Sequence, residues 1–196
     1  MGKNRLEAFS DGVFAIVITI MVLELKRPAS GEFPALLPLI PALSSYLLSF
    51  VHVGIYWNNH HHLFHATPRV NGAILWANLH LLFWLTLFPF ATAWMGETRV
   101  MAAPTAAYGV ILFLAAIAWY IMQSVIIAAD RGAASRLKQA LGRDWKGKIS
   151  PVIYLVAIPV AFANAWVSVG LYALVALIWL VPDRRIEQLF AGESHQ

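Results

Sequence analysis

Long apolar runs separated by short polar segments limit what this 196-residue chain can fold into. A helix that crosses a membrane needs about 20 mostly apolar residues. Four runs meet this length, and they cover residues 6–25, 34–58, 70–95 and 104–129. Hydrophobic residues make up 60% of the chain and charged residues only 12%, so too few polar side chains are present to cover a soluble globule. We therefore expect an all-α membrane protein with one domain, residues 1–196.

The last apolar stretch, residues 151–181, is longer than one span requires. A single helix of that length would measure about 45 Å, against a hydrocarbon core of about 30 Å. Two helices, at 150–165 and 168–182, satisfy the positive-inside rule better, and the Ser-Pro pair at 150–151 predicts the start of the first. With six spans and a cytoplasmic N-terminus, the outer loops hold only Lys26, Arg27 and Arg99. We expect six transmembrane helices in the plasma membrane, with both termini cytoplasmic.

The distribution of charge and the lack of cysteine exclude several classes of protein. Six of the 14 Lys and Arg lie within residues 131–148, where a cytoplasmic loop is expected. Nucleic-acid binding would instead need a basic face on a soluble module, so no nucleic-acid partner is expected. Without cysteine, the chain can form neither disulfides nor thiolate metal sites.

The first apolar run carries different residues on its two sides. At about 100° per residue, one stripe holds Phe9, Gly12, Ile16, Thr19, Ile20 and Leu23. Asp11 points to roughly the opposite side, and an ionisable group within a span usually faces protein or water. We therefore expect Asp11 to face into the helix bundle, while the apolar stripe meets something else. Neighbouring copies of the same helix are one candidate.

This stripe has two interpretations. Rings of Ile16, Ile20 and Leu23 around a symmetry axis would form an apolar constriction, which can gate ions by dewetting. Thr19 would then offer hydroxyl oxygens, and Glu24, near the outer end, would attract cations. Ordinary helix packing is the commoner use of such a stripe. The spacing alone leaves both interpretations open.

A sequence motif adds to the argument. The pattern Arg-x-x-x-Phe-Ser-Asp-Gly-Val-Phe-Ala-Ile runs from Arg5 to Ile16. The second run adds His52, Trp57 and His60-His61-x-Leu63-Phe64, and the third adds Asn78 and Leu87-Phe88-Pro89-Phe90. Together these residues resemble the transmembrane-protein-175 family of potassium channels. The resemblance covers all six spans, and its specific motifs lie in the first three.

The resemblance implies a potassium-permeable cation channel rather than an enzyme, with K⁺ as the conducted ion and no cofactor. The family lacks the usual selectivity-filter loop, and no Thr-Val-Gly-Tyr-Gly stretch occurs in this chain. The family's pore is lined by its first helix, which implies a constriction at Ile16, Ile20 and Leu23 and a role for Thr19 in potassium preference. A single six-helix repeat is similar to the prokaryotic form, a homotetramer.

Polar residues of the first three helices lie at a comparable depth near the inner membrane surface. We expect Ser10 and Asp11 to hydrogen-bond with some of the polar residues of the second and third helices, and such a network would orient the pore helix without doing chemistry. The residues assigned to this structural network are Arg5, Phe9, Ser10, Asp11, His52, Trp57, Asn58, His60, His61 and Asn78, and Asn71 is a further candidate partner.

The intramembrane ionisable residues leave two other functions open. Asp11 and His52 could carry protons in a proton-coupled transporter, although the inverted repeats typical of transporters are not visible. His52 and His80 could hold a haem in a redox protein, whereas a hydrogen-bonded buried histidine is the commoner outcome. The cluster at residues 60–62, with His65, has no carboxylates beside it, so a metal enzyme is disfavoured and a cytoplasmic proton sensor is an alternative.

Overall fold

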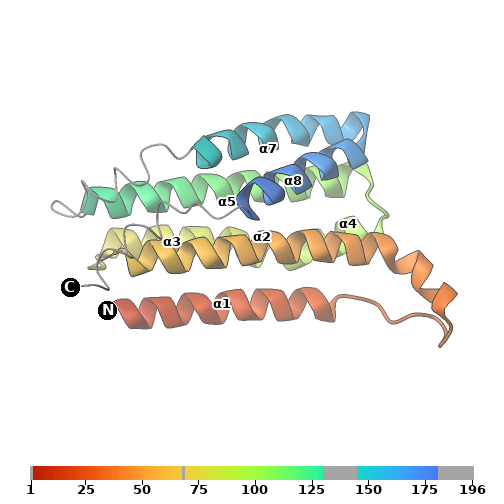
Figure 1. Ribbon diagram of the computed structural model, residues 1–196, viewed down its shortest axis with the longest axis horizontal. Helices are drawn as coiled ribbons and strands as arrows, with labels where there is room; N and C mark the ends of the chain where they lie inside the picture. The colour runs from red at the N-terminus through yellow and green to blue at the C-terminus, as the bar shows by residue number, and fades with distance from the viewer. Residues whose placement is uncertain (1, 68, 130–144, 181–196) are drawn as a thin grey trace.

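The computed structural model describes residues 2–67, 69–129 and 145–180, and these residues are helical apart from short connections (Figure 1). The helices are α1 (Lys3–Leu23), the 3₁₀ helix η1 (Phe33–Leu39), α2 (Ile40–His65), α3 (Gly72–Thr86), α4 (Phe88–Glu97), α5 (Ala102–Ala129), α7 (Trp145–Ala163) and α8 (Ala165–Leu180). Five segments are long and apolar enough to cross a membrane: α1, η1 with α2, α3 with α4, α5, and α7. The shorter α8 is also apolar.

This architecture confirms the predicted all-α membrane protein with six helical segments. Part of the argument for its orientation concerns the basic loop at 131–143 and the pair Arg184-Arg185, and these lie outside the described residues. The cytoplasmic position of both termini therefore stays a prediction.

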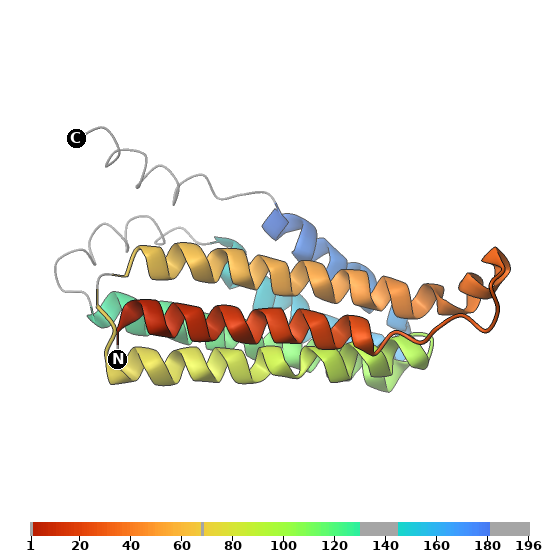
Figure 2. The same cartoon turned by 90° about the horizontal axis from the view of Figure 1, so that it is seen from below.

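The helices run roughly along the long axis of the molecule, with α1 at one edge and α7 at the other (Figure 1). α1 packs against α2, α3 and α4, whereas α5 contacts both α3 and α7 and forms the centre of the bundle. Seen from the α1 side, α1 lies in front of and between α2 and the α3–α4 pair (Figure 2). One face of α1 thus meets its own chain, and the other is left open.

The second helical segment extends further than the sequence predicted. It begins as the 3₁₀ helix η1 and continues as α2 to His65, so the polar residues 58–62 are helical and do not form a break. Leu63 and Phe64 are fully buried or nearly so, and their packing against the bundle keeps the last turn helical. Asn and His disfavour a helix far less than Gly or Pro does, so this polar run can remain helical.

The third segment, predicted as one helix over 70–95, is divided at Leu87. Pro89 cannot donate the backbone hydrogen bond that the carbonyl of Leu85 would need in a continuous helix. The Leu87 amide bonds to the Trp84 carbonyl at 3.2 Å, which is a 3₁₀ contact, and α4 then begins with Pro89 in its first turn. The break bends the chain without separating the two helices.

The described part of the last apolar stretch, residues 151–180, belongs to two helices, as the charge argument predicted, and the break falls at Asn164. Its side-chain oxygen accepts hydrogen bonds from the amides of Trp166 (3.0 Å) and Val167 (3.4 Å) and caps α8. The predicted helix start at Ser150 is wrong, because α7 already begins at Trp145 and Pro151 lies inside it. The Ser150 hydroxyl bonds to the Lys146 carbonyl one turn earlier instead of capping a free amide.

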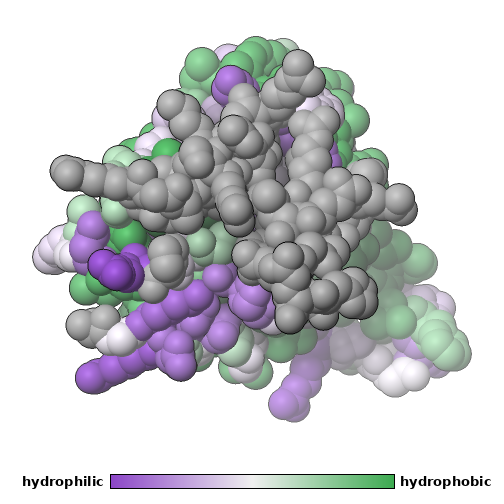
Figure 3. Space-filling model, turned by 60° about the vertical axis from the view of Figure 1, so that its left-hand side comes forward, coloured by the Kyte–Doolittle hydropathy of each residue, from purple (hydrophilic) through white to green (hydrophobic). Residues whose placement is uncertain are grey.

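Polar and apolar surfaces are separated as membrane embedding requires. Hydrophilic residues gather at the end of the bundle that comes forward in Figure 3, where α1 begins and α2 ends. There the Lys3 Nζ donates a hydrogen bond to the His65 carbonyl at 3.1 Å. Large apolar side chains such as Trp76, Phe83 and Leu155 are exposed on the outer surface, which suits contact with lipid.

Candidate functional site: the open face of α1

The buried face of α1 is a narrow stripe. Leu6, Ser10, Phe14, Val17 and Met21 are buried at intervals of three or four residues, the spacing of one helix face. They pack against α2, α3 and α4. This contact sets the rotation of α1 about its own axis and so determines which residues remain outside.

The residues left outside are those of the predicted apolar stripe. Ile16 is 59% exposed, Ile20 40% and Leu23 74%, and Phe9, Gly12 and Thr19 are also exposed. Within one chain these side chains therefore contribute little to the core. They form a continuous apolar surface that must meet lipid or another protein chain.

Thr19 lies on this open face, and its hydroxyl hydrogen is engaged in a hydrogen bond. The Oγ1 atom donates to the Ala15 carbonyl of the same helix at 2.8 Å. A hydroxyl has one donor hydrogen and two acceptor lone pairs. Because the hydrogen points back to the helix, the oxygen lone pairs are free to face a cation.

Ser10, Asn78 and His60 form a directed chain of hydrogen bonds beneath α1. The Ser10 hydroxyl donates to the Leu6 carbonyl at 2.9 Å and accepts from Asn78 Nδ2 at 3.0 Å. Asn78 Oδ1 lies 2.8 Å from His60 Nε2. An amide oxygen can only accept, so His60 Nε2 carries the proton of this bond. The chain joins α1, α3 and α2, and all three residues are buried.

Asp11 differs from the sequence prediction because it does not point into the bundle. It is exposed, and its Oδ1 accepts a hydrogen bond of 3.0 Å from Trp57 Nε1, itself 47% exposed. Successive residues of a helix are about 100° apart, and Ser10 occupies the inward direction. Asp11 therefore lies at the edge where α1 meets α2, on the open side.

The other residues assigned to the network do not take part in these hydrogen bonds. Phe9 is exposed on the open face, and the Arg5 and Asn58 side chains have no hydrogen bond or ion pair within the described ranges. His61 is exposed and stacks on His65 with ring centroids 6.3 Å apart. Asn71 instead caps α3, because its Oδ1 accepts from the Ile74 amide at 2.9 Å.

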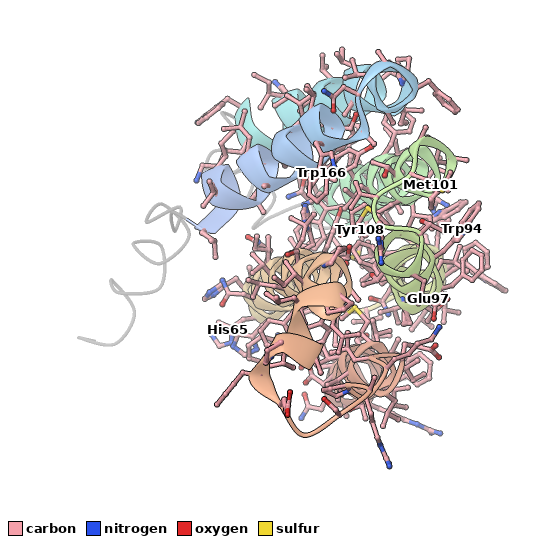
Figure 4. All side chains as sticks on the ribbon, turned by 90° about the vertical axis from the view of Figure 1, so that its right-hand side faces the viewer. His65, Trp94, Glu97, Met101, Tyr108 and Trp166 are labelled. Atoms are coloured by element: carbon pink, nitrogen blue, oxygen red, sulfur yellow. The ribbon has the colours of Figure 1, made fainter. Side chains whose placement is uncertain are left out.

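Glu24 lies directly after the C-terminal end of α1 and lines an open hollow. The hollow is formed with Ile20, Thr86, Pro89, Phe90, Ala93, Trp94 and Glu97. Figure 4 looks onto this end and shows Trp94 at the edge of the bundle and Tyr108 among the helices. Lys26 pairs with Glu97 at 2.8 Å, so Glu24 is the carboxylate of the hollow that keeps its charge unpaired among the described residues.

His52 and His80, the two intramembrane histidines considered for haem binding, lie in different surroundings. His52 is buried, with ring centroids 6.4 Å from those of Tyr108 and Tyr154, whereas His80 is exposed and accepts a hydrogen bond from Trp84 Nε1 at 3.0 Å. Across the described residues, no group of three or more His, Cys, Asp or Glu side chains is placed to hold a metal ion. Asp11 and His52, the pair a proton carrier would use, also lie in separate environments.

One polar cluster was not anticipated from the sequence. Ser49 Oγ lies 2.6 Å from Thr92 Oγ1 and donates to Tyr108 Oη at 3.0 Å. Thr92 also contacts the Met21 sulfur of α1 at 4.0 Å. The buried residues Ser45, Ser49 and His52 recur at helical spacing along α2, and this spacing is the sequence signal that could have indicated a polar face.

Comparison with known proteins identifies the family of this chain. The family model described as endosomal/lysosomal potassium channel TMEM175 matches residues 5–89. A Chryseobacterium protein named a potassium channel is 53% identical over 96% of this chain and 97% of its own length. The human protein named endosomal/lysosomal proton channel TMEM175 is 40% identical over 76 residues, which cover 33% of this chain and 15% of that protein.

A solved structure supports the fold as well as the sequence relationship. It is the crystal structure of a lysosomal potassium-selective channel TMEM175 homolog from Chamaesiphon minutus. The match has a TM-score of 0.78 and 31% identity, and it covers 92% of this chain and 97% of that one. The chain therefore belongs to the TMEM175 family of ion channels.

Proposed function

We propose that this protein is a potassium-permeable cation channel of the plasma membrane, with cytoplasmic termini, and that α1 lines its pore. The observation that carries the proposal is the open face of α1, on which Ile16, Ile20 and Leu23 are all exposed although α1 packs closely against its own chain. K⁺ is the conducted ion, and no cofactor takes part. The function named for the Chryseobacterium and Chamaesiphon relatives supports this assignment.

The pore is formed by four copies of the chain. Lipid would accommodate the apolar stripe, but it would not accommodate the exposed carboxylate of Asp11, which lies at the edge of α1 beside α2. Asp11 lies about two turns inside the first span, so this edge needs protein or water as its neighbour. A homotetramer with α1 around the axis supplies both.

The constriction consists of stacked rings of Ile16, Ile20 and Leu23. Water is unstable between apolar rings of small radius, and an ion that crosses them must lose its hydration shell. Thr19 lies between the first two rings in sequence, and its outward oxygen lone pairs replace part of that shell. Glu24 at the outer end raises the local concentration of cations.

Flux from liposomes tests the function. Purified protein is reconstituted with K⁺ or Na⁺ inside, and efflux is followed with a protonophore present so that protons balance the charge. A channel gives protein-dependent K⁺ efflux that is faster than Na⁺ efflux. Efflux that is equally fast without the protonophore would instead indicate electroneutral exchange of the cation for protons by a proton-coupled transporter, and no efflux of either ion would refute the proposal.

The oligomeric state requires a separate measurement. Native mass spectrometry of the detergent-solubilised protein should give four times the chain mass of 21.7 kDa. A monomer or dimer that still conducts after reconstitution would exclude a tetrameric pore.

A further inference from the structure

A second site lies inside the bundle, away from α1. It is a cavity of about 40 Å³ between α2, α5, α7 and α8, larger than the roughly 10–15 Å³ that one water molecule occupies. Its walls are formed by His52, Ile55, Tyr56, Asn59, Ala116, Trp119, Gly147, Ser150, Tyr154, Val175, Ala176 and Trp179. Most of these side chains are apolar or aromatic, and the channel function makes no use of the cavity.

Two residues of the cavity wall each carry a buried polar atom that has no partner among the described residues. His52 is 3% exposed and Trp119 7%, and within the described part of the chain neither His52 Nε2 nor Trp119 Nε1 makes a hydrogen bond. Buried polar atoms are rarely left in this state, because each such atom has lost its hydrogen bonds to water. Two of them in one cavity indicate an occupant.

The two atoms differ in hydrogen-bonding polarity. His52 Nδ1 lies 2.9 Å from the Leu48 carbonyl, which can only accept, so Nδ1 carries the ring proton. In the neutral ring, His52 Nε2 is then an acceptor. The indole Nε1–H of Trp119 is only a donor. The occupant must therefore both donate and accept a hydrogen bond.

We propose that this cavity binds a hydroxyl compound, either water or a short alcohol. Its O–H donates to His52 Nε2, and its oxygen accepts from Trp119 Nε1. The neighbouring Ser150 hydroxyl cannot take its place, because it already donates to the Lys146 carbonyl at 2.7 Å and accepts from Trp179 Nε1 at 2.9 Å. The apolar walls, such as Ile55 and Val175, suit the alkyl group of an alcohol.

The occupant links α2, which carries His52, to α5, which carries Trp119. α2 also carries Trp57, the partner of Asp11 on the open face of α1. The site therefore stabilises the helix that supports the pore helix, although it lies outside the pore.

A double-mutant cycle in the full-length protein tests the site. His52→Leu and Trp119→Phe should each lower the unfolding midpoint by about 2–6 °C. The unfolding midpoint of the double variant should fall by clearly less than the sum of the two single-variant decreases, because the shared occupant can be lost only once. Trp76→Phe, at a 75% exposed tryptophan, controls for the loss of an indole and should leave the midpoint unchanged. Additive losses, or a rise in either single variant, would mean that the cavity is dry.

A direct readout separates an occupant from altered packing. In ¹⁵N-indole-labelled protein, the Trp119 Nε1 proton, assigned by its absence in Trp119→Phe, should show cross-relaxation with water or with added ethanol. No cross-relaxation with either would overturn the proposal. If added ethanol raises the unfolding midpoint of the wild type but not that of Trp119→Phe, the cavity is an alcohol site. A water cross-peak with no response to ethanol identifies water.

Discussion

Asn78 Nδ2 donates a 3.0 Å hydrogen bond to Ser10 Oγ, and this bond joins α3 to the buried face of α1. Both residues are fully buried, and Asn78 Oδ1 is already bonded to His60. The orientation of the open face of α1 therefore depends on a chain of hydrogen bonds in which every member is satisfied. Removing one member of such a chain lowers the stability of the fold, because the buried polar groups that it bonded to are left unpaired.

Ser10→Ala should destabilise the protein. The substitution leaves the Asn78 amide hydrogen without an acceptor in the bundle, at a cost of about 1–3 kcal/mol. Thermal unfolding in detergent should show a midpoint lowered by several degrees. Ser124→Ala is the matched control, because the exposed Ser124 donates to the Tyr120 carbonyl of its own helix and makes no other side-chain hydrogen bond within the described ranges. Equal midpoints for the two variants would contradict the role of Ser10.

Asp11→Ala should impair assembly more than it changes ion selectivity. The substitution removes the acceptor for Trp57 Nε1 at the edge of α1, where a neighbouring subunit is proposed to pack. Native mass spectrometry should show a smaller tetramer fraction, while the tetramer that remains keeps its ratio of K⁺ to Na⁺ permeability. Asp11→Asn keeps an acceptor oxygen and should preserve more tetramer. A stable Asp11→Ala tetramer in full yield would count against this prediction.

Substitutions in the apolar rings should raise ion flux. Leu23→Ala widens one ring and Ile16→Asn wets another, so both lower the dehydration barrier of the closed pore. Initial K⁺ efflux from liposomes should rise several-fold. Leu155→Ala removes a comparably exposed side chain from α7 and should leave flux unchanged. If the stripe serves only packing, Leu23→Ala and Ile16→Asn would lower stability and leave flux as it was.

Thr19→Val should reduce the preference for K⁺ over Na⁺. Valine has nearly the same shape as threonine, but it lacks the oxygen whose lone pairs face away from the Ala15 carbonyl. Reversal potentials under K⁺ and Na⁺ gradients measure the change, and thermal unfolding checks that the fold is kept. Thr19→Ser retains the hydroxyl and should retain the selectivity. A Thr19→Val channel with wild-type reversal potential would remove Thr19 from the conduction path.

Gly109→Ala should be strongly destabilising. A Cβ at this position of α5 would collide with the ring and hydroxyl of Tyr172, which are held by the hydrogen bond from Tyr172 Oη to the Thr105 carbonyl at 3.2 Å. Overpacking of this kind costs about 1–3 kcal/mol. The midpoint of thermal unfolding should fall, whereas Gly170→Ala, which meets no atom within 4 Å, should be tolerated.

Hydropathy and helical periodicity are local properties. Hydropathy identified the membrane class and the long apolar segments, and the distribution of charge divided the last of them into two helices, with the break at Asn164. The same periodicity placed Ile16, Ile20 and Leu23 on one stripe, because the positions of residues on a helix face follow from their spacing. Of the polar residues that were expected to form one network, Ser10 pairs with Asn78 and Asp11 with Trp57.

Packing between helices determined features that local sequence patterns could not predict. Ser10 and Asp11 are adjacent and both polar, and only the fit of α1 against α2 and α3 turns Ser10 inward and leaves Asp11 at the open edge. The cavity between His52 and Trp119 likewise depends on contacts between distant segments, whereas the division at Leu87 follows from the neighbouring Pro89. Spacing gives the relative angles of residues on one helix, but the rotation of that helix is set by the helices it packs against.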